Sequence, residues 1–566
     1  YLLSHTFYWV FQICHGIYFS KSLYTAISNK IVSHLTLNKT NGSYAFLLPL
    51  KSADYNIEND AQYIVKNNSK DIFNDVTVEN GSISFNMSRD KYIKEVLENN
   101  YLKVKPPIAA DYNRNVIVEF SSPNIAKPFH LGHLRSTIIG NYIANINSYL
   151  QHKTKRINYL GDWGTQFGLI QLGVKIANIT EGEMKSNPIK ALYNAYITAY
   201  EKAQHDKSIN DQAREIFRRL ETGDNSIYHE WEIFKNYTIE ELKRIYERIG
   251  IVFDEYHWES MYSIKHIKHI ISLMEEEKLL VNDEENRRVI SLDTERAVPI
   301  IKSDGSSLYI TRDIAAAVDR FEKYKFDCMY YVTDIAQTEH FSNLVHILNK
   351  MNIPWAERLK HLKYGRIRGM STRKGTGIFL EDILNKAKEV AREKQIQSIT
   401  TKVSLDATDN TNDILGISAV IVNDLKRRRQ KDYVFDWNMI FDMKGDGGIK
   451  LQYTHCRLVN LETNCGAVLV SECDPSLLKE PEVDDLITLI GKFDEVVLKS
   501  YEDLEACVLT VYLFQLSNAI SKALKKLRIK GQPGDLGNQR LLLFHAAKNV
   551  FAQGMKLLGI KPLDKM

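Results

Sequence analysis

The 566-residue sequence contains only six cysteines, and no two of them form a Cys-x-x-Cys pair. The spacing that builds zinc ribbons is therefore absent, and scattered cysteines give no support to a disulfide framework. This usage favours a reducing compartment. Two nucleotide-binding loops are missing as well, since no G-x-x-x-x-G-K-[ST] segment occurs and no G-x-G-x-x-G follows a strand-like run. Kinases, motor ATPases and dehydrogenases are therefore disfavoured.

Acidic residues are missing from the start of the chain, because no Asp or Glu precedes Asp54. That absence resembles a transit peptide, although the fixed positive charges there are lysines and not arginines. The apolar run Thr6 to Tyr18 is shorter than the roughly 20 residues that a bilayer span needs, so we expect no transmembrane helix there. Two interpretations stay open, namely a remnant of a transit peptide and the first helix of a folded domain.

The length predicts two or three domains, each with its own core. The formal net charge of +4 is only mildly basic and indicates local basic patches on the surface. Residues 1–110 alternate short strand-like and helical pieces up to the double proline Pro106-Pro107, which predicts a small α+β domain.

Residues 111–409 show apolar strand runs that alternate with helical segments, as in Val116 to Phe120, Arg156 to Leu160 and Tyr330 to Asp334. This alternation predicts a Rossmann-like parallel α/β sheet, with a helical insertion at about 187–250. Residues 410–566 are helical throughout in pattern, with one helix predicted from Asp484 to Ser500, and predict an all-helical C-terminal domain.

Two histidines in the spacing His-x-Gly-His, His130 and His133, follow the first of these strands and open a predicted helix. Backbone N–H groups at a helix start attract phosphate, and imidazoles can donate hydrogen bonds to phosphate oxygens. Gly132 between them lets a flat group lie close to the backbone. On its own the pattern is equally consistent with a histidine pair at a surface turn that binds a metal.

The longer segment SSPNIAKPFHLGHLRSTIIGN resembles the HIGH signature of class I aminoacyl-tRNA synthetases, and its flanks resemble arginyl-tRNA synthetases. Further segments resemble that family in the same order, and YVTDIAQTEHF and KFDEVVLKS are most similar to the animal mitochondrial form. The similarity covers roughly residues 111–566. The further segments are NYLGDWGTQFG (158–168), SDGSSLYITRD (303–313), GMSTRKGT (369–376), LQYTHCRL (451–458) and GMKLLGIKPLDKM (554–566).

This resemblance implies an arginine–tRNA ligase that forms arginyl adenylate from L-arginine and ATP. It then implies transfer of the arginine to the 2′-hydroxyl of the terminal adenosine of arginine tRNA. By the same resemblance, domain 1–110 contacts tRNA, domain 111–409 is catalytic, and domain 410–566 binds the anticodon. Mg²⁺ is expected to accompany ATP without a protein metal site, and the family's exchange of pyrophosphate with ATP is expected to require tRNA.

The resemblance also implies roles for individual residues. Asp313 corresponds to the family's carboxylate for the guanidinium, with Glu119 as the second, and Tyr309 would pack along the substrate. Asn124 and Gln337 correspond to positions that hold the substrate's polar groups. Without the resemblance, Asp313 is interpreted as the N-cap of a helix that begins at Ile314.

His130, Gly132 and His133 are expected to bind ATP, together with Met370 and Ser371 of the closing loop. That loop departs from the common Lys-Met-Ser-Lys-Ser pattern, because Thr372 stands at the second lysine. Arg373, Lys374 and, on the ATP-binding segment, Lys127 are the catalytic candidates to replace the missing cation. The alternative for Lys127 is a solvated loop residue.

Tyr453 and Arg457 are expected to contact tRNA, since an aromatic ring beside a guanidinium suits stacking on unpaired bases. His455 belongs to the same segment, and Tyr453 is equally consistent with core packing. The basic run from Lys426 to Arg429, together with Lys431, is a weaker candidate for phosphate contact.

Two other functions stay open at this stage. A nucleotidylyltransferase would use the same His-x-Gly-His motif to bind a nucleotide. An inactive synthetase paralogue would bind tRNA without catalysis. We expect a monomer in the mitochondrial matrix that does not bind membranes, with the cytoplasm as the alternative compartment.

Overall fold

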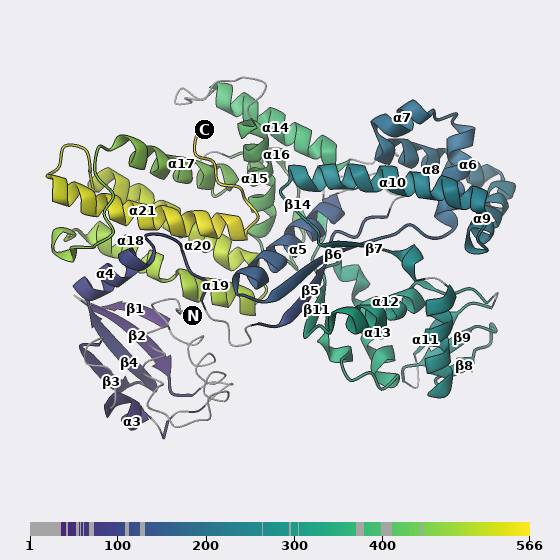
Figure 1. The fold of residues 1–566 in the computed structure, drawn as a ribbon, viewed down its shortest axis with the longest axis horizontal. Helices are drawn as coiled ribbons and strands as arrows, with labels where there is room; N and C mark the ends of the chain where they lie inside the picture. Colours follow the sequence, from purple (N-terminus) through teal and green to yellow (C-terminus); the bar gives the residue numbers. More distant parts are fainter. Residues whose placement is uncertain are drawn as a thin grey trace.

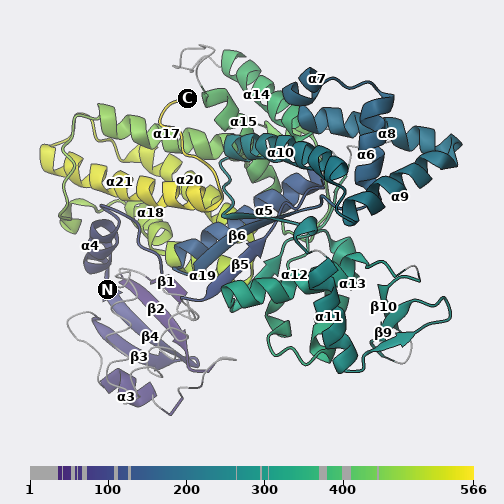
Figure 2. The same ribbon diagram turned by 45° about the vertical axis from the view of Figure 1, so that its right-hand side comes forward.

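The computed structural model describes residues 36–40, 43–51, 56, 58–59, 61–66, 73–107, 113–124, 129, 131–262, 264–293, 296–303, 305–368, 379–397, 410–442 and 445–566. They form an N-terminal α+β unit, a central parallel sheet with its helices, a block of inserted helices, and a C-terminal helical domain (Figure 1). The N-terminal unit and the inserted helices lie at opposite ends of the molecule in both views (Figure 2). The run Thr6 to Tyr18 lies outside the described residues.

The N-terminal unit is a four-stranded antiparallel sheet in the order β1-β2-β4-β3. Its strand β4 alternates buried and half-buried side chains, as expected for a sheet with one covered face. Arg89 at the start of α4 pairs with Asp484 of the helical domain at 2.8 Å, so the two parts are in contact. The elements are β1 (Thr36–Thr40), β2 (Ser43–Pro49), α3 (Ala61–Lys66), β3 (Asp75–Glu79), β4 (Ser82–Ser88) and α4 (Arg89–Asn99).

The central sheet has five strands in the order β12-β11-β5-β6-β7, and every pairing between them is parallel. Val116 to Val118 of β5 are buried, because helices cover both faces of the sheet. The predicted parallel α/β sheet is confirmed. Its main elements are β5 (Asn115–Glu119), α5 (Leu131–Tyr149), β6 (Lys153–Leu160), β7 (Glu255–Trp258), α12 (Tyr309–Tyr324), β11 (Cys328–Tyr331), α13 (Thr338–Lys350) and β12 (Leu359–His361).

The inserted helices form a bundle with a core of its own, which includes Phe167, Leu192 and Trp231. A Cβ on Gly173 would collide with the backbone of Ala195, so α6 packs directly on α8. The bundle therefore begins at α6, earlier than the predicted position 187. Its helices are α6 (Thr165–Ile176), α7 (Glu181–Ser186), α8 (Pro188–His205), α9 (Lys207–Glu221) and α10 (Asn225–Arg248).

A second excursion from the sheet separates β7 from α12. It holds a three-stranded antiparallel sheet in the order β10-β9-β8 and one long helix. Its elements are η1 (Glu259–Met261), α11 (Ile264–Glu276), β8 (Leu280–Asn282), β9 (Arg288–Ser291) and β10 (Ala297–Ile301).

The C-terminal part is helical, as predicted, apart from the two-residue strand β14, which pairs in parallel with β13. One predicted helix, Asp484 to Ser500, is wrong, because the chain breaks at Lys492 into α18 and α19. Gly491 at the break packs against the Tyr92 hydroxyl and leaves no room for a Cβ. The elements are β13 (Ile367–Arg368), α14 (Leu380–Gln397), α15 (Thr411–Leu425), β14 (Tyr433–Val434), α16 (Trp437–Ile440), α17 (Gly448–Asn464), α18 (Pro481–Gly491), α19 (Phe493–Glu502), α20 (Ala506–Lys526) and α21 (Gly534–Leu557).

Helix α20 has the length and the apolar composition of a membrane span. It packs against α17, α18, α19 and α21, and its Leu509, Leu513 and Ile520 are fully buried. A core helix of a helical domain has the same composition. Because α20 packs against four other helices, it is a core helix in this structure.

Candidate active site

The turn after β5 holds two non-glycine residues in the left-handed region, Ser121 with φ of 74° and Ser122 with φ of 46°. Side chains from other elements hold this turn in place. The Ser136 Oγ accepts a hydrogen bond from the Ser121 amide at 2.9 Å, and Asn158 Oδ1 accepts one from the Ser122 amide at 3.0 Å. Tyr246 of the inserted helix α10 lies 2.6 Å from Ser121 Oγ. Strain that several partners maintain is typical of functional turns.

Asn124, at the end of that turn, packs over Gly161 at the end of β6. The two residues form a parallel bridge, and a Cβ on Gly161 would lie 2.9 Å from Asn124 Nδ2. Glycine at position 161 therefore allows Asn124 to sit at the carboxyl edge of the sheet, where ligands of parallel sheets bind.

Gly132 and His133 lie in the first turn of α5. The Phe129 ring stacks on the His133 ring with centroids 5.4 Å apart, and the Tyr364 hydroxyl donates to the Gly132 carbonyl at 3.1 Å. These contacts hold the start of α5 next to the residues that precede β13. The predicted residues Lys127 and His130 lie outside the described residues, as do Met370, Ser371, Arg373 and Lys374 of the closing loop.

Asp313 and Tyr309 lie one turn apart on α12, which begins at Tyr309 with Leu308 as its N-cap. The interpretation of Asp313 as a helix N-cap is therefore wrong, because the residue lies inside the helix. Tyr309 is 58% exposed and stands beside the site. Nε2 of His340 lies 2.7 Å from Asp313 Oδ2; burial lowers the pKa of His340, but Asp313 outweighs this and leaves it raised.

Glu259 is a site residue that sequence reasoning missed. It lies in η1, directly after β7, and its Oε2 is buried without a hydrogen-bond partner among the described residues. Burial raises the pKa of Glu259 to about 8, and the negative charges of Asp313 and Asp162 add to the rise. A buried carboxylate oxygen without a donor, beside a second carboxylate, is matched to a cationic ligand. In the sequence, the only signs of such a role are that Glu259 is acidic and that it directly follows a strand.

Glu119, which is predicted as the second carboxylate for the guanidinium, has a partner within the protein. Arg320 of α12 donates to Glu119 Oε2, and both side chains are almost fully buried. The ring of Tyr159 lies 4.8 Å from the Arg320 guanidinium. Burial raises the pKa of the Glu119 carboxyl, and Arg320 acts against that rise. The pair joins β5 to α12, and the charge of Asp313 acts on both Glu119 and Glu259.

Gln337 ends the short helix η2 (Ile335–Gln337), which follows β11, and its side chain is exposed. The N-cap Asp334 accepts a hydrogen bond from the Ala336 amide at 2.7 Å. Gln337 therefore lies one turn before His340, at the same edge of the sheet as Asn124 and Asp313.

Comparisons with known proteins agree with this geometry. A family model described as "tRNA synthetases class I (R), catalytic domain" matches residues 93–437, and a "DALR anticodon binding domain" matches residues 451–566. The Homo sapiens "Probable arginine--tRNA ligase, mitochondrial" is 39% identical over 505 residues, 88% of this chain and 87% of its own. This chain belongs to the class I arginyl-tRNA synthetase family. A cytoplasmic form from Dictyostelium discoideum is 38% identical over 513 residues, 86% of this chain and 87% of its own.

Solved structures of arginyl-tRNA synthetases share the fold. The Plasmodium falciparum enzyme has a TM-score of 0.75 at 24% identity, over 96% of this chain and 98% of its own. The Thermus thermophilus enzyme has a TM-score of 0.77 at 20% identity, over 94% of this chain and 96% of its own.

On the helical domain of this arginyl-tRNA synthetase, Tyr453 is 48% exposed on α17. The Arg457 guanidinium lies 5.5 Å from its ring, which leaves an aromatic face and a cation together at the surface. Core packing of Tyr453 is therefore wrong. His455 points the other way, because it is buried with Nδ1 2.8 Å from the Leu563 carbonyl oxygen.

Two arginines of the basic run after α15 contact other parts of the protein. Arg427 lies over the Tyr433 ring at 4.6 Å, and Arg429 donates to the Lys363 carbonyl oxygen at 2.8 Å. Arg428 and Lys431 are exposed. Those two side chains remain the candidates of this run for phosphate contact.

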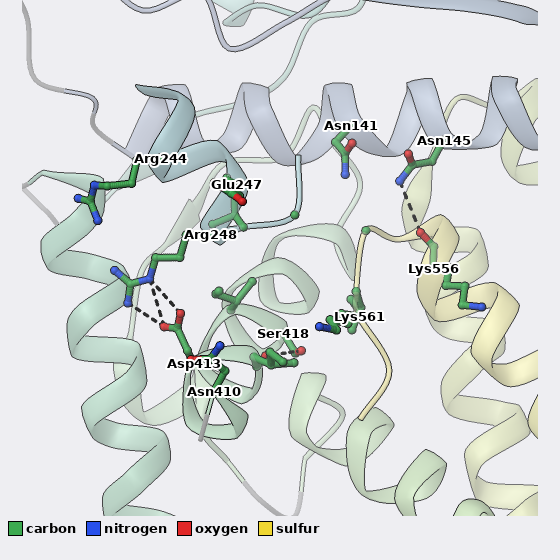
Figure 3. A pocket seen from close by; sticks show the side chains of 16 residues that line it. Asn141, Asn145, Arg244, Glu247, Arg248, Asn410, Asp413, Ser418, Lys556 and Lys561 are labelled. Atoms are coloured by element: carbon green, nitrogen blue, oxygen red, sulfur yellow. Dashed lines mark hydrogen bonds and ion pairs between the residues drawn. The ribbon is translucent and has the colours of Figure 1, made fainter. Parts of the chain in front are cut away.

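No group of three or more His, Cys, Asp or Glu that could hold a metal ion occurs in the part of the chain that the structure describes. A cavity of about 810 Å³ lies between α5, the end of α10, the start of α15 and the chain after α21 (Figure 3). None of the predicted site residues that the structure describes line this cavity. Its wall includes the pair Arg248 and Asp413, 2.7 Å apart, which joins α10 to α15.

Proposed function

We propose that the chain is an arginine–tRNA ligase whose site holds the guanidinium of L-arginine between Asp313 and Glu259. The observation that carries this assignment is the pair of carboxylates beside the exposed Tyr309, in a chain of the arginyl-tRNA synthetase family. A guanidinium is planar and carries five donors, so two carboxylates can pair with it from different sides. Tyr309 packs along the aliphatic part of the substrate.

The reaction has two steps. The carboxylate of arginine attacks the α-phosphorus of ATP, the bond to the β-phosphate oxygen breaks, and pyrophosphate leaves. The 2′-hydroxyl of the terminal adenosine then attacks the arginyl carbonyl, and AMP leaves with the bonding electrons. The protein positions the reactants and stabilises charge, without a covalent nucleophile. Mg²⁺ supplies positive charge to the phosphates and enters with ATP.

Asn124 and Gln337 hold the α-amino and carboxylate ends of the substrate, since both lie at the carboxyl edge of the sheet. Gly132 and His133 at the start of α5 support the ATP phosphates and adenosine. His130, Met370, Ser371, Arg373 and Lys374 complete the ATP site in this proposal, which for them rests on the sequence alone.

Arginine binding is expected to release protons near pH 7. The pKa of Glu259 is about 8, so the carboxyl is largely protonated before the substrate arrives. A cationic guanidinium beside it favours the carboxylate and lowers this pKa, so up to about one proton should leave per arginine bound. Calorimetric titration in buffers of different ionisation enthalpy measures the number of protons released.

Two comparisons make that titration specific. The release should disappear well above pH 8, where Glu259 is already ionised, and in Glu259→Gln at every pH. Equal release by Glu259→Gln and the wild type would place the titrating group elsewhere, for instance at His340. No release from the wild type near pH 7 would contradict the role of Glu259.

Lys127→Ala is expected to slow arginine activation. The lysine lies three residues before His130 and would replace the cation that Thr372 cannot supply. A charge-assisted hydrogen bond contributes ~1.5 to 3 kcal/mol, so the rate of pyrophosphate exchange should fall roughly ten- to a hundredfold. Adding Thr372→Lys should recover part of the loss. A wild-type rate in Lys127→Ala, with a slow rate in Arg373→Ala, would assign the role to the loop.

The helical domain 410–566 binds the anticodon arm through the exposed Tyr453 and the neighbouring Arg457, where unpaired bases can stack. The catalytic domain spans 111–409, and the N-terminal unit contacts another part of the tRNA.

We assign the protein to the mitochondrial matrix as a monomer that does not bind membranes. Similarity to mitochondrial relatives supports the compartment, although cytoplasmic forms match almost as well. Fractionation of cells and light scattering test these assignments.

A charging assay decides the activity. The purified protein, ATP and radiolabelled arginine are incubated with arginine tRNA, and lysine tRNA with lysine serves as the control. Acid-precipitable arginine on arginine tRNA alone is the expected result. Product formed on a small phosphorylated compound without tRNA would favour a nucleotidylyltransferase. Binding of tRNA without charging or exchange would favour an inactive paralogue.

A further inference from the structure

The side chain of Arg135, two residues after His133 on α5, is completely buried and contacts three segments of the chain. Its Nε lies 3.3 Å from Oδ2 of Asp424 near the end of α15, and its Nη1 donates to the Gly365 carbonyl oxygen at 2.5 Å. The Tyr433 ring of β14 lies 5.1 Å from the guanidinium, and the Tyr433 hydroxyl donates to Asp424 Oδ2 at 2.9 Å. The guanidinium of Arg135 therefore makes one ion pair, one hydrogen bond and one ring contact with these three segments.

The two chain ends that flank residues 369–378 are both attached to the predicted ATP-binding segment. On one side, Gly365 bonds Arg135 and the Tyr364 hydroxyl donates to the Gly132 carbonyl at 3.1 Å, shortly before β13 ends at Arg368. On the other side, the Leu380 amide donates to the Phe129 carbonyl at 2.8 Å. The parts of the chain that lead into and out of 369–378 therefore share one anchor with the start of α5.

Helix α15, which supplies Asp424, is held firmly by the C-terminal domain. A Cβ on Gly448 would collide with the Ser418 carbonyl, so α17 rests directly on α15. Gln452 of α17 donates to Ser418 Oγ at 2.9 Å and to the Lys561 carbonyl at 2.8 Å. The position of the Asp424 carboxylate relative to α5 is therefore set by a helix that packs firmly against α17.

We propose that Asp424 is a positioning residue for ATP-dependent activation of arginine, which it serves by holding Arg135 between α5 and the chain before β13. The proposal rests on the proposed function and concerns the ATP side of that site. Without the Asp424 carboxylate, the Arg135 cation loses its counter-charge, and the guanidinium no longer fixes Gly365 relative to Gly132 and His133. The groups that bind ATP would then adopt a range of relative positions. Arginine recognition, on α12 and η1, does not involve this contact.

The test measures pyrophosphate exchange with arginine, ATP and arginine tRNA for three full-length variants, with rates expressed per titrated active site. Asp424→Asn removes the counter-charge, Arg135→Lys keeps a cation but loses the planar guanidinium that reaches both Asp424 and Gly365, and Tyr433→Phe removes one hydroxyl. Misplacement of reacting groups by about 1 Å costs on the order of a hundredfold, so kcat should fall about ten- to a hundredfold in the first two. Tyr433→Phe should lose about threefold, as one neutral hydrogen bond is removed. The KM for arginine should change by less than about twofold.

Asp413→Asn is the matched control, because it makes the same change on the same helix and breaks a pair with arginine that touches neither α5 nor β13. It should leave kcat and the KM for ATP unchanged. A purely structural role for Asp424 would lower Tm while kcat and the KM for ATP per active site stayed at wild-type values, and that result would overturn the proposal. If Asp424→Asn does not fold, Arg135→Lys and Tyr433→Phe decide by the same criterion. A wild-type protein without arginine-dependent exchange would refute the proposed function instead.

Discussion

Replacing Asp313 with asparagine should lower kcat/KM for arginine by at least about a hundredfold, while the KM for ATP changes little. The substitution keeps size and shape but removes the charge that faces the guanidinium. Leaving a buried ion without its partner costs ~3 to 5 kcal/mol, which corresponds to roughly two to four orders of magnitude in rate. Steady-state pyrophosphate exchange with arginine tRNA present measures both constants. The effect should belong to arginine alone, since Asp313 lies on α12, whereas the predicted ATP-binding residues Gly132 and His133 lie at the start of α5.

Asp319→Asn is the matched control for this substitution. Asp319 lies on the same helix and accepts a weak hydrogen bond from the Tyr262 hydroxyl at 3.4 Å. Its loss should change arginine kinetics by less than about twofold, as for most substitutions away from a site. Normal arginine kinetics in Asp313→Asn would show that the contact between Asp313 and His340 is structural. Glu259 would then be the remaining candidate of this pair to bind the guanidinium.

Breaking the pair between Glu119 and Arg320 should lower stability more than it lowers specificity. Both side chains are almost fully buried, so Glu119→Gln or Arg320→Met leaves one buried charge unpaired. Such a loss costs ~3 to 5 kcal/mol of unfolding free energy, whereas a variant that removes both charges should recover much of it. Denaturant titration, followed by tryptophan fluorescence, measures the shift in the midpoint of the unfolding transition.

The kinetics of the surviving folded protein separate the two roles of Glu119. Because Arg320 already binds the carboxylate, the KM for arginine in Glu119→Gln should stay near the wild-type value once rates are corrected for active sites. A large rise in that KM with unchanged stability would instead make Glu119 a carboxylate for the substrate, as the family resemblance implied. Failure of the double variant to recover stability would show that the pair is not coupled.

Much of the fold was predictable because burial imprints a local periodicity on a sequence. The continuous apolar run Val116 to Val118 predicted a strand covered on both faces, and β5 is that strand. The helical periodicity after residue 410 predicted the C-terminal helices. Where the prediction was wrong, a contact from a distant element was responsible. The break at Lys492 accompanies the packing of Gly491 against Tyr92, which lies in the N-terminal unit.

The sequence by itself predicted where the site lies, from the His-x-Gly-His spacing at a strand-to-helix turn, since helix starts bind phosphate and parallel sheets bind ligands at that edge. Tertiary structure alone decided which carboxylate faces which cation. Glu119 and Arg320 stand far apart in the sequence, as do Arg135 and Asp424, and each pair meets only when the sheet and the helical domain are assembled. Glu259 became a candidate for the same reason. Its carboxylate is ordinary in the sequence, and only burial beside Asp313 and Asp162 gives it a pKa of about 8.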